Sequence, residues 1–339
     1  MNFTNFDFFK KDNNIDLIDK FKKNFFNSNL SNSTIIYGEK GIGKSIFVKF
    51  FVNSIFLELN DKEKKNHNTN LIINNSHPNI KTVSLLYDEK IKKYKNNISI
   101  DQIRELQNFI YQSSINKLPK FIIIDSCDEL NLNSSNSLLK ILEEPKLDTY
   151  FFLISHQLSK ITDTIKSRCI KFNFKKPTFN EFKDILLLNI GHSLSDDEIE
   201  YFFHLSNGSP GIAKNLYLQD TNEMINKLLD IFKEKKIFSN NIIQLSNELN
   251  KYEKNQFENF LILFKFIIIN ILKIKLGINI KKRFSEKLLF EINELSKFLN
   301  TKSCFNLLDY LNTNENNLFK LNLDKKIFTI NLLSEISNN

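Results

Sequence analysis

The strongest chemical signal in the chain is a glycine-rich segment that ends in a lysine and a serine. Residues 38–45 (GEKGIGKS) fit the pattern G-x-x-x-x-G-K-[ST], between a β-branched run and an apolar, helix-like stretch. In such a loop, backbone N–H groups at the start of a helix surround phosphate oxygens. Lys44 would contact the β- and γ-phosphates and Ser45 the Mg²⁺. We therefore expect ATP or ADP with Mg²⁺ to bind through Gly38, Gly41, Ile42, Gly43, Lys44 and Ser45.

The composition makes these residues conspicuous. The chain has 339 residues but only seven glycines, whereas average usage would give roughly 24. Arginine is rarer still, and Arg104, Arg168 and Arg283 are all of it. A bias toward Lys, Asn, Ile and Phe explains both shortages. Under such a bias, a glycine or arginine that remains is more often required where it stands.

A second part of the expected phosphate site is a carboxylate at the end of an apolar strand. Asp125 closes the run KFIIID and is expected to hold the Mg²⁺ through water. In ATP-hydrolysing proteins of this design, a second carboxylate follows at once and activates the attacking water, but Ser126 stands there. Losing a general base typically costs about 10²–10⁴ in rate. Unless Asp128 or Glu129 replaces it, the sequence predicts nucleotide binding with weak or no hydrolysis.

Charge and cysteine content exclude several classes of protein. The net charge is +8, but the lysines are spread along the whole chain and no nucleic-acid-reading motif is visible. Three scattered cysteines provide neither a disulfide scaffold nor a zinc site. No secretory signal is apparent, and the longest apolar run, residues 260–272, is shorter than a membrane span. We therefore expect a cytoplasmic protein that has no zinc and does not contact membranes.

The elements that position these residues follow from the apolar runs. They predict strands at 34–37, 81–87, 120–125, 150–155 and 170–174, helices at 46–59, 100–114 and 134–144, and a polar loop at 61–76. Apolar strands that alternate with helices indicate a parallel sheet with helices on both faces. After Pro177 the strand signals stop. The predicted fold is an α/β P-loop core (1–175), a small helical domain (176–235) and a longer all-α domain (236–339).

Seven motifs occur in the order in which one protein family carries them. They are GEKGIGKS at 38–45, HPN at 77–79, IDQIREL at 100–106, IDSCD at 124–128, NSLLKILEEP at 136–145, SRC at 167–169 and GSPG at 208–211. Together they resemble the delta-prime subunits of bacterial DNA polymerase III clamp loaders, which are AAA+ proteins. The resemblance covers about residues 1–215, and NSLLKILEEP and SRC are its most specific parts.

This resemblance implies an AAA+ core, a helical lid and an all-α collar. The collar would join delta and gamma/tau subunits in a hetero-oligomeric ring, with the segment 257–276 as an interface helix covered by partner subunits. Such a ring loads a sliding clamp onto primed DNA during replication. The chain would meet primer–template DNA mainly through the complex.

The resemblance also implies roles for single residues. Arg168 corresponds to the arginine finger, which reaches ATP bound by a neighbouring subunit, and Ser155 to the first sensor of the γ-phosphate. The turn at 208–211 lacks the arginine with which ATP-active relatives sense nucleotide. A retained finger beside a missing base and a missing second sensor fits delta-prime better than a motor subunit. Some relatives carry a four-cysteine zinc module before the HPN motif, but residues 57–76 contain no cysteine.

Three other functions stay open at this point. The first is an ATP-hydrolysing motor subunit of the gamma/tau kind, which Ser126 argues against. The second is a P-loop kinase, which would need several arginines to hold phosphate, whereas this chain has few. The third is a nucleotide-free scaffold whose loop is a relic.

Overall fold

Two compact units make up the chain, Met1–Pro177 and Thr178–Asn339. The computed structural model describes residues 12–59, 65–89, 93–191, 194–219, 221–234, 239–278, 286–321 and 323–335. At the unit boundary, the side chain of Thr178 caps the next helix by accepting from the backbone N–H of Glu181. The division into three domains stays a prediction.

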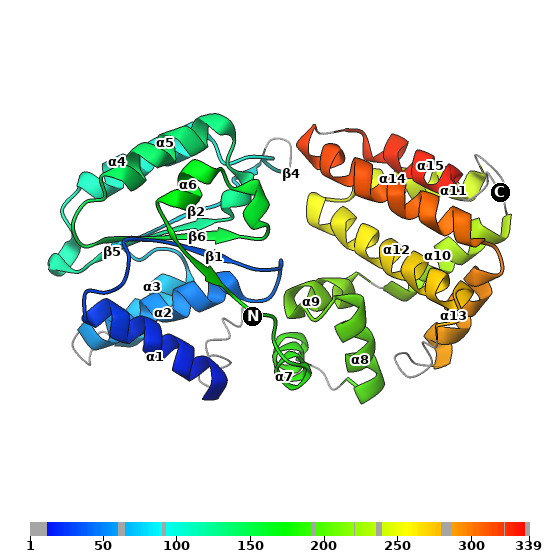
Figure 1. The fold of residues 1–339 in the computed structure, drawn as a ribbon, viewed down its shortest axis with the longest axis horizontal. Coiled ribbons are helices and arrows are strands. Elements are labelled where there is room, and N and C mark those ends of the chain that lie inside the picture. Colours follow the sequence, from blue (N-terminus) through cyan, green and yellow to red (C-terminus); the bar gives the residue numbers. More distant parts are fainter. Residues whose placement is uncertain are drawn as a thin grey trace. The chain divides into compact units, whose positions relative to one another are not determined.

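The first unit is built around a sheet of five parallel strands in the order β2-β5-β6-β1-β7 (Figure 1). The strands are β1 (Ser33–Tyr37), β2 (Ile80–Val83), β5 (Lys120–Asp125), β6 (Thr149–Ser155) and β7 (Ile170–Asn173). Tyr37 pairs with both Ser155 and Asn173, so the carboxyl ends of β1, β6 and β7 meet at one edge of the sheet. The predicted α/β fold with a parallel sheet is confirmed.

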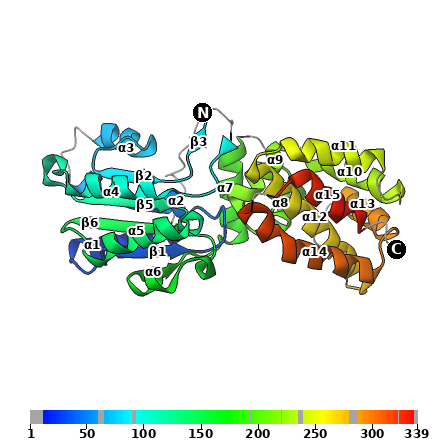
Figure 2. The same ribbon diagram turned by 90° about the horizontal axis from the view of Figure 1, so that it is seen from above.

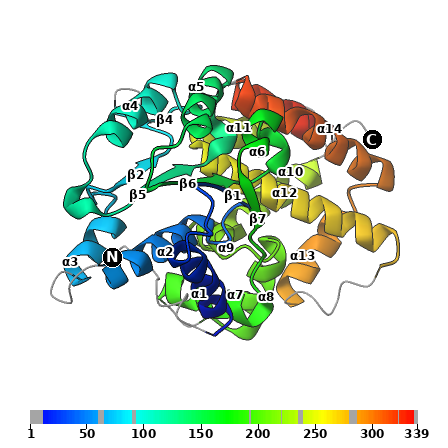
Figure 3. The ribbon, with the colours of Figure 1, turned by 60° about the vertical axis from the view of Figure 1, so that its left-hand side comes forward.

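Helices cover both faces of this sheet, as Figures 1 and 3 show. On one face lie α1 (Asp12–Phe26), α2 (Lys44–Leu59) and α3 (Lys65–Ile73), and on the other α4 (Ile100–Tyr111), α5 (Leu132–Glu143) and α6 (Asp163–Ser167). Short 3₁₀ turns η3 (Ile115–Lys117), η4 (Cys127–Glu129) and η5 (Leu158–Lys160), and a hairpin of β3 (Tyr87–Asp88) with β4 (Lys93–Tyr94), complete the described elements.

Alternation along the strands builds a core on each face of the sheet. Phe121 of β5 stacks near Phe152 of β6 and meets Phe56 of α2 edge-on. The neighbouring residues Ile122 and Ile124 point the other way, into the cluster formed with α4 and α5. All of these side chains are almost completely buried. A strand buried on both faces has to be apolar throughout, which is why the run FIII in β5 contains no polar residue before Asp125.

Two sequence-based predictions in this unit are wrong in detail. The strand expected at 81–87 is only Ile80–Val83, because the carbonyl of Ser84 accepts from the Gln102 side chain at 2.8 Å and the chain then turns into the β3–β4 hairpin. The loop expected at 61–76 contains helix α3, whereas residues 60–64 lie outside the described part. Helix α3 packs on α2 through buried Ile72, and its Thr69 donates to the Asn53 side chain at 3.0 Å.

The second unit is entirely helical where it is described. Its helices are α7 (Phe179–Ile190), α8 (Asp196–Leu205), α9 (Pro210–Leu218), α10 (Thr221–Glu234), α11 (Asn240–Lys251), α12 (Lys254–Lys275), α13 (Glu286–Ser296), α14 (Thr301–Lys320) and α15 (Lys325–Ser334). One hydrophobic cluster extends from Phe182 to Leu333 and joins all nine. None of the helices in the described residues has the length and apolarity needed to cross a bilayer.

Helix α12 corrects the expectation of an interface helix at 257–276. It runs alongside α14 (Figures 1 and 2) and also contacts α13. Most of its apolar side chains, among them Leu261, Phe264 and Ile268, are completely buried within the unit. Most of the apolar surface seen in the sequence is therefore covered by helices of the same chain, whereas Ile269 and Leu276 remain exposed.

Candidate phosphate site and arginine finger

The expected phosphate loop connects the carboxyl end of β1 to the start of α2. Gly41 and Gly43 adopt φ angles of 78° and 100°, in the region that favours glycine. Gly38 has a φ of 156°, and a Cβ atom there would lie 2.4 Å from the carbonyl oxygen of Phe174. No side chain fits at position 38 unless the chain after β7 moves. The loop therefore has the glycine-dependent shape that lets backbone N–H groups approach a phosphate.

Lys44 is buried and turned onto its own loop. Its Nζ donates to the carbonyl oxygens of Gly38 and Glu39, each at 2.6 Å, and the residue is only 3% exposed. Burial lowers the pKa of its ammonium to about 8, although Asp125, Asp128 and Glu39 pull in the opposite direction. The loop thus holds a buried cation between two carbonyl oxygens, and this cation suits a phosphate.

The structure brings the other predicted ligands of the site to the same edge of the sheet. Asp125 ends β5 and pairs with Ile154, one residue before Ser155 at the end of β6. Gly38 donates its backbone N–H to the carbonyl oxygen of Ser155 at 3.2 Å, which ties the loop to β6. Asp125 also contributes to the electrostatic field at Lys44. Ser45 follows Lys44 in the first turn of α2.

Asp128 has a role at this edge that the sequence did not reveal. Its Oδ1 accepts from the Ser155 hydroxyl at 2.7 Å, and its Oδ2 accepts from the backbone N–H of His156 at 2.5 Å. Ser155 is completely buried, and its hydroxyl hydrogen is directed at the carboxylate. The sequence shows only that a second carboxylate follows shortly after Asp125. The alignment of β5 with β6 is needed to show that this carboxylate accepts hydrogen bonds from Ser155 and His156.

Arg168 lies at the opposite edge of the sheet. It caps the C-terminus of α6 and stands two residues before β7 begins. Because all five strands are parallel, the amino end of β7 lies a whole strand length away from the carboxyl ends that carry the phosphate loop. The structure therefore separates Arg168 from Lys44, Asp125 and Ser155.

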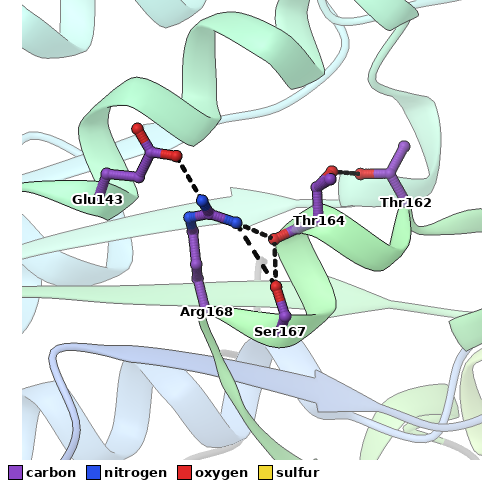
Figure 4. A network of polar contacts seen from close by, with 5 residues as sticks. All are labelled: Glu143, Thr162, Thr164, Ser167 and Arg168. Atoms are coloured by element: carbon purple, nitrogen blue, oxygen red, sulfur yellow. Dashed lines mark hydrogen bonds and ion pairs between the residues drawn. The ribbon is translucent and has the colours of Figure 1, made fainter.

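Three contacts orient the Arg168 side chain (Figure 4). Its Nη2 donates to Oε1 of Glu143 at 2.5 Å, and its Nη1 donates to the carbonyl oxygen of Thr164 at 3.0 Å and to the Ser167 hydroxyl at 3.5 Å. The side chain is 36% exposed and that of Glu143 is 48% exposed. Cys169 beside it is buried, and burial raises the pKa of its thiol to about 11, so the neutral thiol is no nucleophile at neutral pH.

In the second unit, the GSPG turn starts helix α9. Ser209 accepts from the backbone N–H of Ile212 at 3.5 Å, and Pro210 takes the first helical position. The arginine expected of an ATP-sensing relative is replaced by Gly211 and Ile212. No group of metal-binding side chains is found among the described residues.

Comparison with known proteins identifies the first unit. Residues 13–178 match the family model described as "DNA polymerase III, delta subunit". The chain is 36% identical over 129 residues to DNA polymerase III subunit delta-prime of Pseudomonas aeruginosa, covering 37% of this chain and 38% of that protein. Residues 13–178 belong to the DNA polymerase III delta-prime subunit family. The family resemblance inferred from the motifs is confirmed for this part of the chain.

The family-model match includes both edges of the sheet. It contains the loop at 38–45 and Arg168, whereas nearly all of the second unit lies beyond it. The delta-prime subunit of Bacillus subtilis is 31% identical over 150 residues, 43% of each chain. The matched region thus spans about two fifths of the length of these delta-prime relatives.

Among solved structures, the chain resembles a DNA polymerase III gamma subunit-related protein from Thermotoga maritima. That likeness covers 95% of this chain and 97% of the other, at 14% sequence identity and a TM-score of 0.45.

Proposed function

We propose that the chain is a clamp-loader subunit of a DNA polymerase III holoenzyme, of the delta-prime kind. In this role it helps to place a sliding clamp on primed DNA and supplies Arg168 to ATP bound by a neighbouring subunit. The observation that carries the proposal is the position of Arg168 at the amino-end edge of the sheet, opposite the chain's own phosphate loop. An arginine in that place lies away from the chain's own loop, so we assign it to a nucleotide held by another chain.

The chemistry of Arg168 suits this task. In comparable nucleotide hydrolases, a guanidinium supplied in trans stabilises the charge on the transferring phosphoryl group and accelerates hydrolysis about 10³–10⁵-fold. A lysine would be a poorer substitute, because only arginine presents a planar fork of N–H donors. Arg168 is one of three arginines in the chain and lies in the region of the family match.

For the chain's own site, we propose that ATP or ADP with Mg²⁺ binds without appreciable hydrolysis. The glycine cradle at Gly38 and the buried ammonium of Lys44 fit a phosphate group. Ser45 and Asp125 would hold the Mg²⁺, which supplies charge neutralisation of the phosphates when bound. Ser126 offers no carboxylate, and both oxygens of Asp128 already accept hydrogen bonds, which disfavours it as a base.

The partners of such a subunit are the other clamp-loader subunits, delta and gamma/tau, in a hetero-oligomeric ring, together with the sliding clamp. Primer–template DNA is met mainly through the complex. The P-loop kinase alternative loses its basis, because the matched family is one of DNA polymerase III subunits. No structural observation favours the motor subunit or the nucleotide-free scaffold over this proposal.

The test is the ATPase activity of the complex that the full-length chain forms with its clamp-loader partners. Arg168→Ala should abolish nearly all hydrolysis at the single site it serves, because a finger is worth about 10³–10⁵ there. The clamp- and DNA-stimulated rate of the complex should fall by at least the share that this site contributes. Lys166→Ala is the matched control, since Lys166 is a cation on the same short helix and pairs with Asp163 at 2.6 Å. Full activity of the Arg168→Ala complex would disprove the role in trans.

A turnover assay on the isolated chain separates the proposal from the motor alternative. We expect no ATP hydrolysis above the background that a Lys44→Ala variant shows. Hydrolysis that disappears with Lys44→Ala would instead identify an active motor site.

A further inference from the structure

The guanidinium of Arg168 links the C-terminal end of α5 to a backbone carbonyl of α6 at the amino-end edge of the sheet (Figure 4). Glu143 is the last residue of α5, and Thr164 belongs to α6. The contacts of Nη2 with Glu143 and of Nη1 with the Thr164 carbonyl therefore hold the group from two sides. We propose that Glu143 is a positioning residue, which orients Arg168 toward the nucleotide of a neighbouring subunit. This inference rests on the finger role proposed above.

The geometry lets Arg168 bind a phosphate while its ion pair with Glu143 stays intact. A guanidinium carries five N–H donors. Within the described part of the chain, two of them on Nη1 face Thr164 and Ser167, and one on Nη2 faces Glu143. Nε–H and the second N–H of Nη2 remain, and two donors are what a bidentate contact with a phosphate requires.

The carboxylate also limits where Arg168 can be. A free arginine side chain samples many rotamers and loses that freedom when it binds a phosphate. Glu143 fixes the far end of the side chain before a neighbour arrives, so less freedom is lost on binding. Preorganisation of this kind raises the rate of a step that depends on the placement of the arginine.

The same pair contributes little to folding. Both side chains are at least about a third exposed, and exposed ion pairs are screened by water. Loss of the Glu143 carboxylate should therefore lower the ATPase rate that depends on Arg168, but it should hardly change the thermal stability of the chain. This difference separates a positioning role from a merely structural one.

The experiment uses the full-length chain in its clamp-loader complex, with saturating clamp and primed DNA. Glu143→Ala should slow hydrolysis at the site served by Arg168 about two- to fivefold, the size expected for one exposed ion pair. The kcat of the complex should therefore fall less than in Arg168→Ala, with little change in KM for ATP. Glu143→Gln should restore most of the rate, because its amide oxygen still accepts from Nη2. Glu144→Ala, which removes the adjacent carboxylate, is the matched control and should behave as the wild type. The midpoint of thermal unfolding should be the same for all four proteins.

Arg168→Ala in the same assay keeps the two proposals apart. If Arg168→Ala impairs the complex and Glu143→Ala does not, or if Glu143→Ala increases the rate, the positioning role is wrong while the finger stands. If Arg168→Ala has no effect, both fall. Where both hold, adding Glu143→Ala to Arg168→Ala should reduce the rate no further.

Discussion

Lys44 is a cation whose charge depends on what lies beside it. Burial holds the pKa of its ammonium near 8, and its Nζ is satisfied by two loop carbonyls. An anion placed next to it favours the charged form and raises the pKa again. Binding of a phosphate should therefore be accompanied by proton uptake at Lys44 wherever the free protein has begun to lose that proton.

The affinity for Mg²⁺-ATP should consequently depend on pH. Below a pH of about 8, Lys44 is protonated both free and bound, so its contribution to the affinity should be constant. Above this pH the free protein loses the proton, and the affinity should fall, by at most about tenfold per pH unit. Titration calorimetry in buffers of different ionisation enthalpy measures both the affinity and the proton uptake. Lys44→Ala should bind weakly with no such dependence, and a wild-type affinity that stays constant through alkaline pH would contradict the assignment.

Gly38 offers a second test at the scale of one residue. Gly38→Ala should lower the free energy of unfolding by about 2–4 kcal/mol, because it adds a steric conflict with Phe174 to an unfavourable φ. Gly277 is the control, since it has a φ of 73° but, among the described residues other than its own chain neighbours, no contact within 4 Å of the place that an added methyl group would take. Gly277→Ala should therefore lose only about 1–2 kcal/mol. Urea denaturation without nucleotide measures both, and equal losses would mean that the clash is relieved.

At the scale of elements, the features that the sequence predicts correctly are those encoded in short runs of consecutive residues. The apolar runs in β5 and β6 define the sheet, and the glycine spacing defines the loop, because both are written in consecutive residues. Helix α3 was missed because its polar sequence is held by packing on α2 rather than by its own periodicity. The Ser155–Asp128 bond was missed for a similar reason, since it joins residues 27 positions apart that only the pairing of β5 with β6 brings together.

Helix α12 shows how an apolar run can be misread, and two adjacent residues test the correction. Ile268 is completely buried, whereas Ile269 is 40% exposed. Ile268→Ala should destabilise the isolated chain by about 2–5 kcal/mol, because it leaves a cavity in the core. Ile269→Ala should change the stability by less than about 0.5 kcal/mol. Thermal or urea unfolding of the isolated chain measures both, and a small effect at Ile268 would restore the interface interpretation.

At the scale of the whole molecule, the two units differ in how far the family match covers them and in how their cores are built. The first contains the family match and both of the sheet edges where the candidate sites lie. The second has a single core to which residues on both sides of position 235 contribute. Polar contacts also cross that position, since Lys227 pairs with Glu248 at 2.8 Å and Asn259 donates to Gln219 at 2.9 Å. The predicted lid and collar thus share their interior.

A fragment of residues 178–339 should therefore fold on its own, with cooperative thermal unfolding seen by circular dichroism. A fragment of residues 236–339 should unfold without cooperativity, because it lacks the part of the core formed by α7–α10. Cooperative unfolding of the shorter fragment would instead support the independent third domain that the sequence predicted.

The contact between Gly38 and Phe174 has an evolutionary consequence. The fold itself favours glycine at this position, because the chain just after β7 packs against it without any ligand. Selection would keep Gly38 even in a descendant protein that no longer binds nucleotide. Conservation of Gly38 in a lineage therefore indicates a packing requirement and not nucleotide binding. Ser45 is different, since the described part of the chain gives its hydroxyl no hydrogen bond. Lineages in which Ser45 varies while Gly38 is conserved would be those in which the loop keeps its shape but no longer binds nucleotide.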